Sequence, residues 1–269
     1  MMRPHTRDRQ KNFSFYKEID MKIGLLGTGS IGKTLARKLS EAGHDVKVAN
    51  SRGPETIDAD VLEFGARAVQ ATEAVVDVEV VILSIPLDKL PGTAGLISKL
   101  PPEVVVIDTS NYYPMRDGTI DAIEQGQVES LWVVEKVGRP IVKAWNAIFF
   151  NSFLKKGKSV GSPDRIALPV AADNARDKEV AMALVGDTGF DAVDAGPLAD
   201  SWRQQPGSPA YCTDLTRDQL PGALAAAERP RLAKRRDLAV AVVSERLENV
   251  GDNFPDLDFA IAVNRAIYL

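Results

Sequence analysis

Apolar and polar positions alternate along the chain in two ways, and each way predicts a different element. Short runs of β-branched and aliphatic residues predict buried strands between residue 22 and about residue 110: KIGLL, DVKVAN, VEVVILSIP and EVVVIDTS. Stretches with apolar residues at helical spacing separate these runs, as at Ile31, Leu35 and Leu39. Strands that alternate with helices predict a parallel sheet with helices on both faces.

The pattern continues beyond residue 140, but less regularly. RIALPVAAD predicts a buried strand, NARDKEVAMALVGDTG an amphipathic helix, and FDAVDAG a further strand that continues or caps the first sheet. A loop with glycine and proline, SWRQQPGSPAY, precedes two helical stretches, RLAKRRDLAVAVVSERLENV and DLDFAIAVNRAIYL. The first twenty residues are polar, of mixed charge and without periodicity, which predicts a flexible leader over residues 1–20.

Composition narrows the range of functions. The chain has 269 residues, 45% of them apolar, and a formal charge of -4, so no basic excess is present to bind nucleic acid. No apolar run approaches the roughly 20 residues of a membrane span, and the leader lacks the apolar centre of a signal peptide, so we expect a cytoplasmic protein that does not bind membranes. One cysteine, Cys212, excludes an internal disulfide. The two histidines, His5 and His44, are poorly placed for a proton relay or a zinc site, so we expect no metal.

The first predicted strand leads into a GxGxxG pattern formed by Gly27, Gly29 and Gly32. Gly27 permits a tight turn, Gly29 lets the backbone approach a pyrophosphate, and Gly32 lets the following helix pack closely on the strand. The N-terminus of that helix offers free N–H groups to the anion, which brings Thr28, Ser30 and Ile31 against the phosphates. Strand, glycines, helix and second strand in this order predict a dinucleotide site.

The fold prediction follows from this motif. We predict an α/β protein with a Rossmann-type doubly wound parallel sheet and a smaller C-terminal α/β and helical portion. Residues 21–145 would form the domain that binds the dinucleotide, and residues 146–269 the C-terminal portion.

The end of the second strand indicates which dinucleotide binds. NAD-selective sites commonly carry an acidic residue there, whereas this chain has Asn50, Ser51 and Arg52. A guanidinium can pair with the 2′-phosphate of NADP, and the Ser51 hydroxyl can donate a hydrogen bond to it. We therefore predict NADP(H), with a solvated Arg52 and a turn-capping Asn50 as the alternative interpretation.

Two further strand ends, LSIP and DTSN, are expected to face the nicotinamide, because ligands bind at the carboxyl ends of strands in open α/β sheets. Ser84, Ile85 and Pro86 would line the space for the ribose and the nicotinamide ring. Ser110 and Asn111 would form hydrogen bonds to polar atoms near that ring. The alternative is that both segments are ordinary connections between strand and loop.

These segments resemble the deazaflavin-dependent NADP oxidoreductases, a family that shares a module with the NADPH-binding domain of the STEAP metalloreductases. The resemblance runs from about Met21 to Leu198 and rests on GTGSIG, NSR, LSIP, KAWNAI and DAGPL. It implies direct hydride transfer between NADPH and a deazaflavin or flavin stacked on the nicotinamide, with Asn146 and Phe149 near the acceptor. No catalytic residue is assigned, because such a transfer depends on positioning more than on a protein acid.

Several alternatives remain open. Beyond Leu198, Trp202 and Arg203 could bind a planar or anionic acceptor, or could belong to a rigid surface loop. A reductase of a small carbonyl, imine or 2-oxo acid would need a proton donor, for which Lys143, Tyr112 and Tyr113 are candidates. A non-catalytic module that senses NADPH is a third possibility. The apolar C-terminal helices predict a homodimer.

Overall fold

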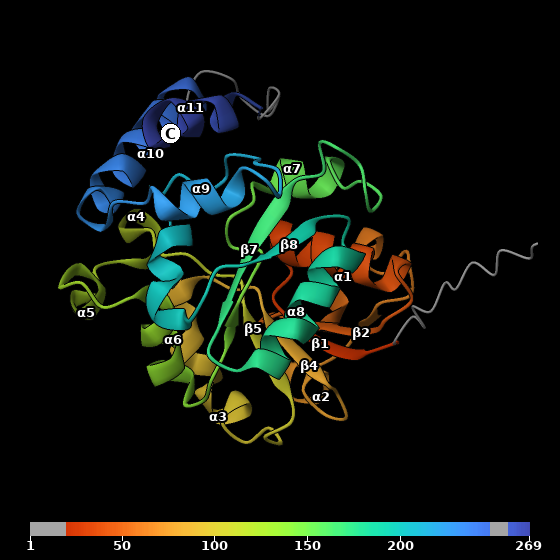
Figure 1. Cartoon of the computed structure of the whole chain (residues 1–269). Coiled ribbons are helices and arrows are strands. Elements are labelled where there is room, and N and C mark those ends of the chain that lie inside the picture. Colours follow the sequence, from red (N-terminus) through yellow and green to blue (C-terminus); the bar gives the residue numbers. More distant parts are fainter. Residues whose placement is uncertain (1–19, 248–257) are drawn as a thin grey trace, which may run out of the picture.

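We describe a computed structural model of the chain over residues 20–247 and 258–269 (Figure 1). The predicted leader lies outside the described residues except for Asp20. The centre of the molecule is an eight-stranded sheet in which one neighbouring pair of strands is antiparallel and every other pair is parallel. In spatial order the strands are β3 (Arg67–Ala68), β2 (Asp45–Ala49), β1 (Lys22–Leu26), β4 (Val80–Leu83), β5 (Val105–Asp108), β6 (Val142–Lys143), β7 (Ala167–Ala172) and β8 (Asp191–Asp194).

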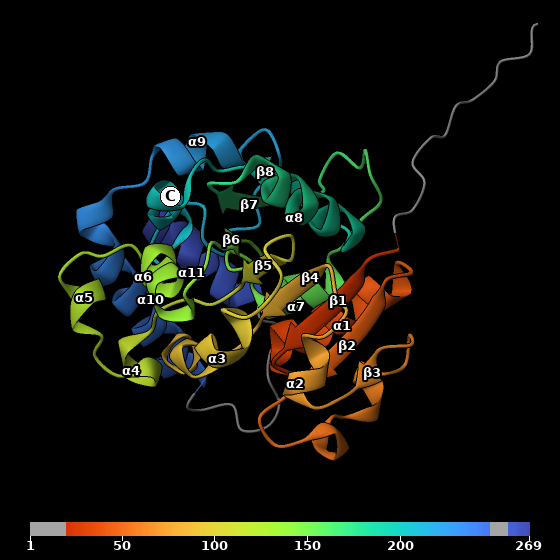
Figure 2. The same ribbon diagram turned by 90° about the horizontal axis from the view of Figure 1, so that it is seen from below.

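Helices lie on both faces of this sheet (Figure 2). One face packs against α1 (Ser30–Glu41), α7 (Phe150–Lys155) and α8 (Ala175–Asp187). The other packs against α2 (Ala71–Ala74), α3 (Ala94–Ile97) and α6 (Glu129–Val137). The remaining helices of the described residues are α4 (Pro114–Asp117), α5 (Asp121–Glu124), α9 (Leu220–Ala225), α10 (Leu232–Leu247), α11 (Asp258–Tyr268) and the 3-10 turns η1 (Pro54–Thr56), η2 (Ala59–Val61), η3 (Leu87–Thr93), η4 (Leu198–Gln204) and η5 (Arg229–Arg231).

The apolar runs read from the sequence become central strands because both of their faces are buried. Successive residues of a strand point to opposite faces, so Ile82 joins the core under α1 and α8 while its neighbours Val81 and Leu83 join the core under α3 and α6. All three side chains are fully buried. The uninterrupted apolar sequence of β4 is therefore the pattern expected of a strand in a doubly covered parallel sheet.

The predicted Rossmann-type fold is confirmed, and the structure decides how the later strands attach. Strands β7 and β8 continue the first sheet, because β7 pairs antiparallel with β6 through Val142 and Lys143. The short strand β6 was not expected from the KAWNAI segment, since only two residues pair. The loop predicted at SWRQQPGSPAY begins in the 3-10 turn η4. The boundary at residue 145 stays a prediction.

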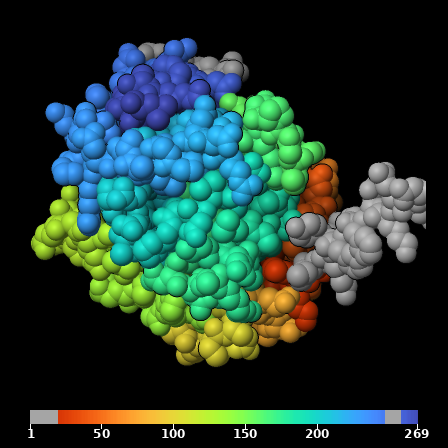
Figure 3. Space-filling model, in the orientation of Figure 1, coloured from red at the N-terminus to blue at the C-terminus, as the bar shows by residue number. Residues whose placement is uncertain are grey.

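The two C-terminal helices, α10 and α11, lie side by side and cap one end of the molecule (Figures 1 and 3). They pack through a small third core that contains Ala239, Val263 and Tyr268 of the helices with Ala147 and Tyr211 of the body. Across residues 20–247 and 258–269, none of the helices combines the length and the apolar character that a bilayer crossing would require.

Candidate functional site

The turn between β1 and α1 has the geometry of a pyrophosphate cradle. Gly27 has a φ of 112°, and a Cβ there would collide with the carbonyl oxygen of Ser84. A Cβ on Gly32 would collide with the carbonyl oxygen of Gly27, whereas a Cβ on Gly29 would have no neighbour within 4 Å. The first and third glycines therefore serve close packing, and the second faces an open space that a phosphate can enter.

The N-terminus of α1 points its free N–H groups at this space. Gly29 is the N-cap residue and provides no side-chain hydrogen bond to the helix, and no acidic residue stands in the first turn. The first N–H groups of a helix and its dipole favour an anion at such a position. Ser30 and Ile31 line the space, and their contact with the phosphates stays a prediction.

Asn50 organises the turn that follows β2. Its Oδ1 accepts hydrogen bonds from the backbone N–H groups of Arg52 (2.9 Å) and Gly53 (3.0 Å). Its Nδ2 donates to Thr56 Oγ1 (2.9 Å) and to Thr28 Oγ1 (3.3 Å), which ties the turn to the glycine loop. Asn50 thus acts as the turn cap considered above, and the turn that it holds leaves Ser51 and Arg52 exposed beside the cradle.

The charges around Arg52 include a residue that the sequence did not single out. Lys33, on the first turns of α1, forms an ion pair with Asp58 beyond the turn. Lys33, and to a lesser extent Arg52, lowers the pKa of the Asp58 carboxyl below its ordinary value. Lys33 and Arg52 therefore both lie near Asp58 on this surface, and the carboxylate of Glu55 lies against Gly53 in the same turn.

A cleft of about 430 Å³ continues from the cradle past the carboxyl ends of β4 and β5. We call it the hydride cleft. It lies where the strand order reverses around β1 and β4, which is the usual ligand position in doubly wound sheets. Its lining residues are Gly29, Ser30, Ile31, Ser84, Ile85, Pro86, Thr109, Ser110, Asn111, Tyr113, Arg116, Trp145, Asn146, Ile148, Phe149, Phe150, Tyr211 and Cys212.

A network of side-chain amides fixes one wall of the hydride cleft. Asn111 Nδ2 donates to the carbonyl oxygen of Asn146 (2.9 Å), and Asn146 Nδ2 donates to Asn111 Oδ1 (3.0 Å). Gln204 Nε2 donates to Asn146 Oδ1 (2.8 Å) from the buried turn η4. Asn146 is 2% exposed, so its main role in this structure is to lock the strand ends of the cleft together.

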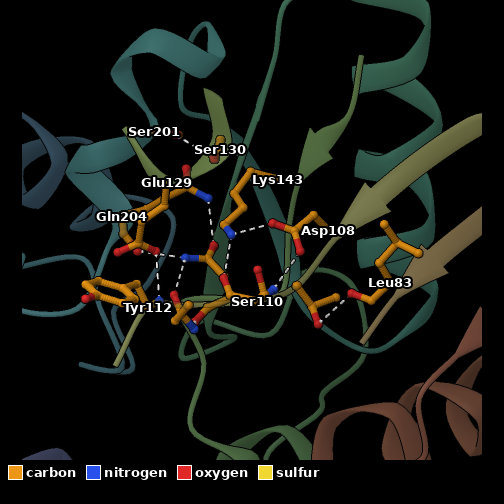
Figure 4. Close-up of polar contacts among 12 residues, drawn as sticks. Leu83, Asp108, Ser110, Tyr112, Glu129, Ser130, Lys143, Ser201 and Gln204 are labelled. Atoms are coloured by element: carbon orange, nitrogen blue, oxygen red, sulfur yellow. Dashed lines mark hydrogen bonds and ion pairs between the residues drawn. The ribbon is translucent and has the colours of Figure 1, made fainter. Parts of the chain in front are cut away.

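Beneath this wall lies a buried ion pair that positions the end of β5 (Figure 4). Lys143 Nζ lies 2.6 Å from Asp108 Oδ2, and both side chains are 0% exposed. The same ammonium donates to the carbonyl oxygen of Ser110, and Asp108 Oδ1 accepts from the Ser110 N–H (3.0 Å). The Ser110 hydroxyl is buried at the edge of the cleft and has no partner among the described residues. It is the kind of unpaired polar atom that a bound nicotinamide amide could satisfy.

The far wall of the hydride cleft is aromatic. Phe149 and Phe150 have ring centroids 5.1 Å apart, and the hydroxyl oxygens of Tyr113 and Tyr211 lie 2.8 Å apart. Burial raises the pKa of both phenols, so both stay protonated at neutral pH. The guanidinium of Arg116 is neutralised by its contacts of 2.7 and 2.8 Å with the carboxylate of Asp117. An uncharged planar ring could therefore lie between this wall and the nicotinamide position.

The structure separates the predicted site residues into three groups. The hydride cleft is lined by the residues predicted at the two strand ends, and also by Asn146 and Phe149. The strand-end residues are Ser84, Ile85, Pro86, Ser110 and Asn111. Asn50, Ser51 and Arg52 lie beside the cradle instead. Trp202 and Arg203 lie outside the cleft: Arg203 stacks on the Trp202 ring at 4.5 Å and donates to the carbonyl oxygen of Leu224 in α9.

Two of the three candidate proton donors are also engaged elsewhere. Lys143 is enclosed by its buried ion pair, and the Tyr112 hydroxyl hydrogen-bonds to Glu124 (2.9 Å) away from the cleft. Of the three candidates, only Tyr113 lines the hydride cleft. The sequence did not reveal its pairing with Tyr211, because the two residues are 98 positions apart.

Comparison with known proteins agrees with this geometry. Residues 22–112 match the family described as "NADP oxidoreductase coenzyme F420-dependent", which confirms the resemblance over the glycine turn, the Asn50 turn and the ends of β4 and β5. The chain is 54% identical over 54 residues to the protein YjhV of Escherichia coli K12, which covers 20% of this chain and 39% of that protein. It is also 30% identical over 148 residues to glyoxylate/hydroxypyruvate reductase A of Serratia proteamaculans. This match covers 53% of this chain and 43% of the reductase.

One solved structure resembles a larger share of the chain. A hypothetical protein from Sinorhizobium meliloti superimposes with a TM-score of 0.65 at 26% identity, over 74% of this chain and 96% of its own. The chain spans about two fifths of the length of the curated relatives that it matches. Residues 22–112 are thus similar to the NADP oxidoreductase family, and the likeness to the Sinorhizobium meliloti structure extends over most of the chain.

Proposed function

We propose that the protein is an NADPH-dependent oxidoreductase that transfers a hydride between NADP(H) and a flavin-type or deazaflavin-type acceptor. The observation that carries the proposal is the continuity of the hydride cleft, which runs from the free N-terminus of α1 to the aromatic wall at Phe149. Such a cleft can hold a nicotinamide and a second ring face to face.

The residues present fit NADP(H) on three counts. The space in front of Gly29 admits the pyrophosphate, Lys33 and Arg52 offer cations for the 2′-phosphate, and the unpaired Ser110 hydroxyl faces the nicotinamide end. NADP(H) supplies the hydride when bound. The chain itself orients the ring through the Asn111–Asn146 wall and excludes water through its aromatic side chains.

The acceptor class is supported by what lines the far wall. Among the described residues, Arg116 is the one charged residue that lines the hydride cleft, and its charge is paired with Asp117. Cys212 is buried and burial raises its thiol pKa, so it stays protonated. A planar acceptor that receives a hydride directly needs aromatic contact and close approach, and this wall provides both.

Anaerobic oxidation of NADPH, followed optically, tests the proposal with a deazaflavin, FMN, riboflavin, pyruvate, glyoxylate and a small imine as acceptors. We expect turnover with a flavin-type ring. Phe149→Ala should lower kcat for that acceptor about tenfold or more, since a misplaced ring loses the near-attack geometry. Leu154→Ala, on the exposed side of the adjacent helix α7, is the matched control and should leave kcat unchanged. Turnover with carbonyl compounds alone would reject the flavin-type acceptor.

A second candidate is the reduction of a small 2-oxo acid, and two observations favour it. The paired hydroxyls of Tyr113 and Tyr211 lie in the hydride cleft and could donate a proton to a developing alkoxide. The likeness to glyoxylate/hydroxypyruvate reductase A covers 148 residues. Tyr211→Phe should then lower kcat with glyoxylate while leaving flavin reduction unchanged. Tight NADPH binding without turnover of any acceptor would instead favour a non-catalytic sensor.

A further inference from the structure

A second cavity of about 150 Å³ adjoins the hydride cleft, between the body of the protein and the C-terminal helices. We call this cavity the helix compartment. It shares Tyr113, Phe149 and Tyr211 with the cleft, so these three side chains form the boundary between the two spaces. The other residues that line it are Ala239, Val240, Val243, Ser244, Ala260, Asn264 and Tyr268.

The walls of the helix compartment are apolar or uncharged. Ala239, Val240 and Val243 come from one face of α10, and Ala260 comes from α11. Its polar groups are three phenols, the Ser244 hydroxyl and the Asn264 amide, whose Nδ2 donates to the carbonyl oxygen of Cys212 (3.3 Å). No charged side chain of the described residues lines it. A charged group placed there would lose its hydration without gaining a counter-ion.

The size of the helix compartment sets what it can hold. Apolar protein cavities of roughly 150 Å³ accept a benzene-sized molecule. The small residues Ala239 and Ala260 leave this room, because longer side chains at these inward positions would fill it. Because Tyr113, Phe149 and Tyr211 line both spaces, a ring or chain held in the helix compartment would lie one side chain away from the hydride cleft.

We propose that the helix compartment binds an apolar substituent of the hydride acceptor, about the size of one aromatic ring or a branched chain of four to six carbons. This inference rests on the proposed function, because the substituent belongs to the molecule whose reacting group lies in the hydride cleft. The acceptor is then an amphipathic molecule with an uncharged apolar end, and α10 and α11 determine its selectivity. An acceptor with an anionic chain at this end is excluded.

The first test is binding, which does not depend on turnover. Fluorobenzene is titrated into the full-length protein with saturating NADPH, and its ¹⁹F NMR line is followed. We expect broadening with the wild type and its loss in Val243→Phe, which fills the helix compartment with a ring. Leu238→Phe, at a position of α10 that is 51% exposed, is the matched control and should retain the broadening. Ser244→Asp, at a half-buried edge of the compartment, provides a second variant if Val243→Phe does not fold.

The second test is kinetic and uses matched acceptors. Riboflavin is compared with its 7,8-didemethyl analogue, and phenylpyruvate with pyruvate. For the pair that is turned over, we expect the KM of the more apolar member to be about tenfold lower, the discrimination that methyl groups or a ring give in an apolar pocket. Val243→Phe should abolish this difference and leave the NADPH Kd unchanged.

The outcomes separate this inference from the proposed function. Normal NADPH oxidation with equal KM values within a pair, or fluorobenzene binding that persists in Val243→Phe and Ser244→Asp, overturns the helix compartment as a binding site. If no acceptor is reduced but fluorobenzene binds the wild type and not the filled variant, the compartment stands and the oxidoreductase proposal fails.

Discussion

Replacement of Lys143 by methionine should destabilise the protein strongly, because it leaves Asp108 as an unpaired buried charge. The ammonium and the carboxylate are 2.6 Å apart, and both side chains are 0% exposed. Removing one partner of a buried pair costs about 3–5 kcal/mol. The Ser110 carbonyl also loses its donor, which favours the upper part of that range. Since domains of this kind are stable by roughly 5–15 kcal/mol, the loss is a large share of the total.

The measurement is the free energy of unfolding in urea at neutral pH, from the midpoint and slope of the transition. The double variant Lys143→Met with Asp108→Asn removes both charges and should recover a substantial part of the loss. Lys136→Met is the matched control, because Lys136 pairs with Glu135 on the surface and should contribute less than about 1 kcal/mol. A Lys143→Met variant within about 1 kcal/mol of the wild type would refute the reasoning.

Three further predictions concern the cofactor, pH and assembly. Arg52→Ala should weaken NADPH binding by about 1–3 kcal/mol with NADH nearly unchanged; equal losses in titration calorimetry would show that Arg52 does not contact the 2′-phosphate. Burial raises the pKa of Glu129 from 4.5 to about 7, so the folded state binds this proton more tightly and stability falls as pH rises from about 4.5 through about 7. Glu129→Gln should flatten the unfolding free energy between about pH 5 and pH 8, and an unchanged slope would assign the effect to another group. We also propose a homodimer through the outer side of α10, where Leu238 and Val242 are exposed; sedimentation that shows only monomer at micromolar concentration would contradict it.

Local sequence was sufficient to predict the dinucleotide-binding half of the protein. The strands alternate with helices within short spans, and the roles of Gly27, Gly29 and Gly32 follow from backbone sterics that act between adjacent segments. The positions of the strand ends at one edge of the sheet also follow, because parallel strands joined by right-handed crossovers present their carboxyl ends together. The turn cap at Asn50 was only the alternative interpretation, yet it too is local, because its hydrogen bonds span a few residues apart from the one to Thr28.

Only the tertiary structure decided the acceptor side. Tyr113 hydrogen-bonds to Tyr211, 98 positions away in the sequence, and Asn146 hydrogen-bonds to Gln204, 58 positions away. The periodicity of a sequence does not predict contacts at such separations. Trp202 and Arg203 carried suitable chemical groups, yet they stack on each other and Arg203 bonds to α9, and neither lines the cleft. Lys143 was a candidate proton donor in the sequence, but the register of β5 and β6 places it beside Asp108 in a buried ion pair. Residue type thus determined the chemistry available to this protein, whereas long-range packing determined which of those groups face the same space.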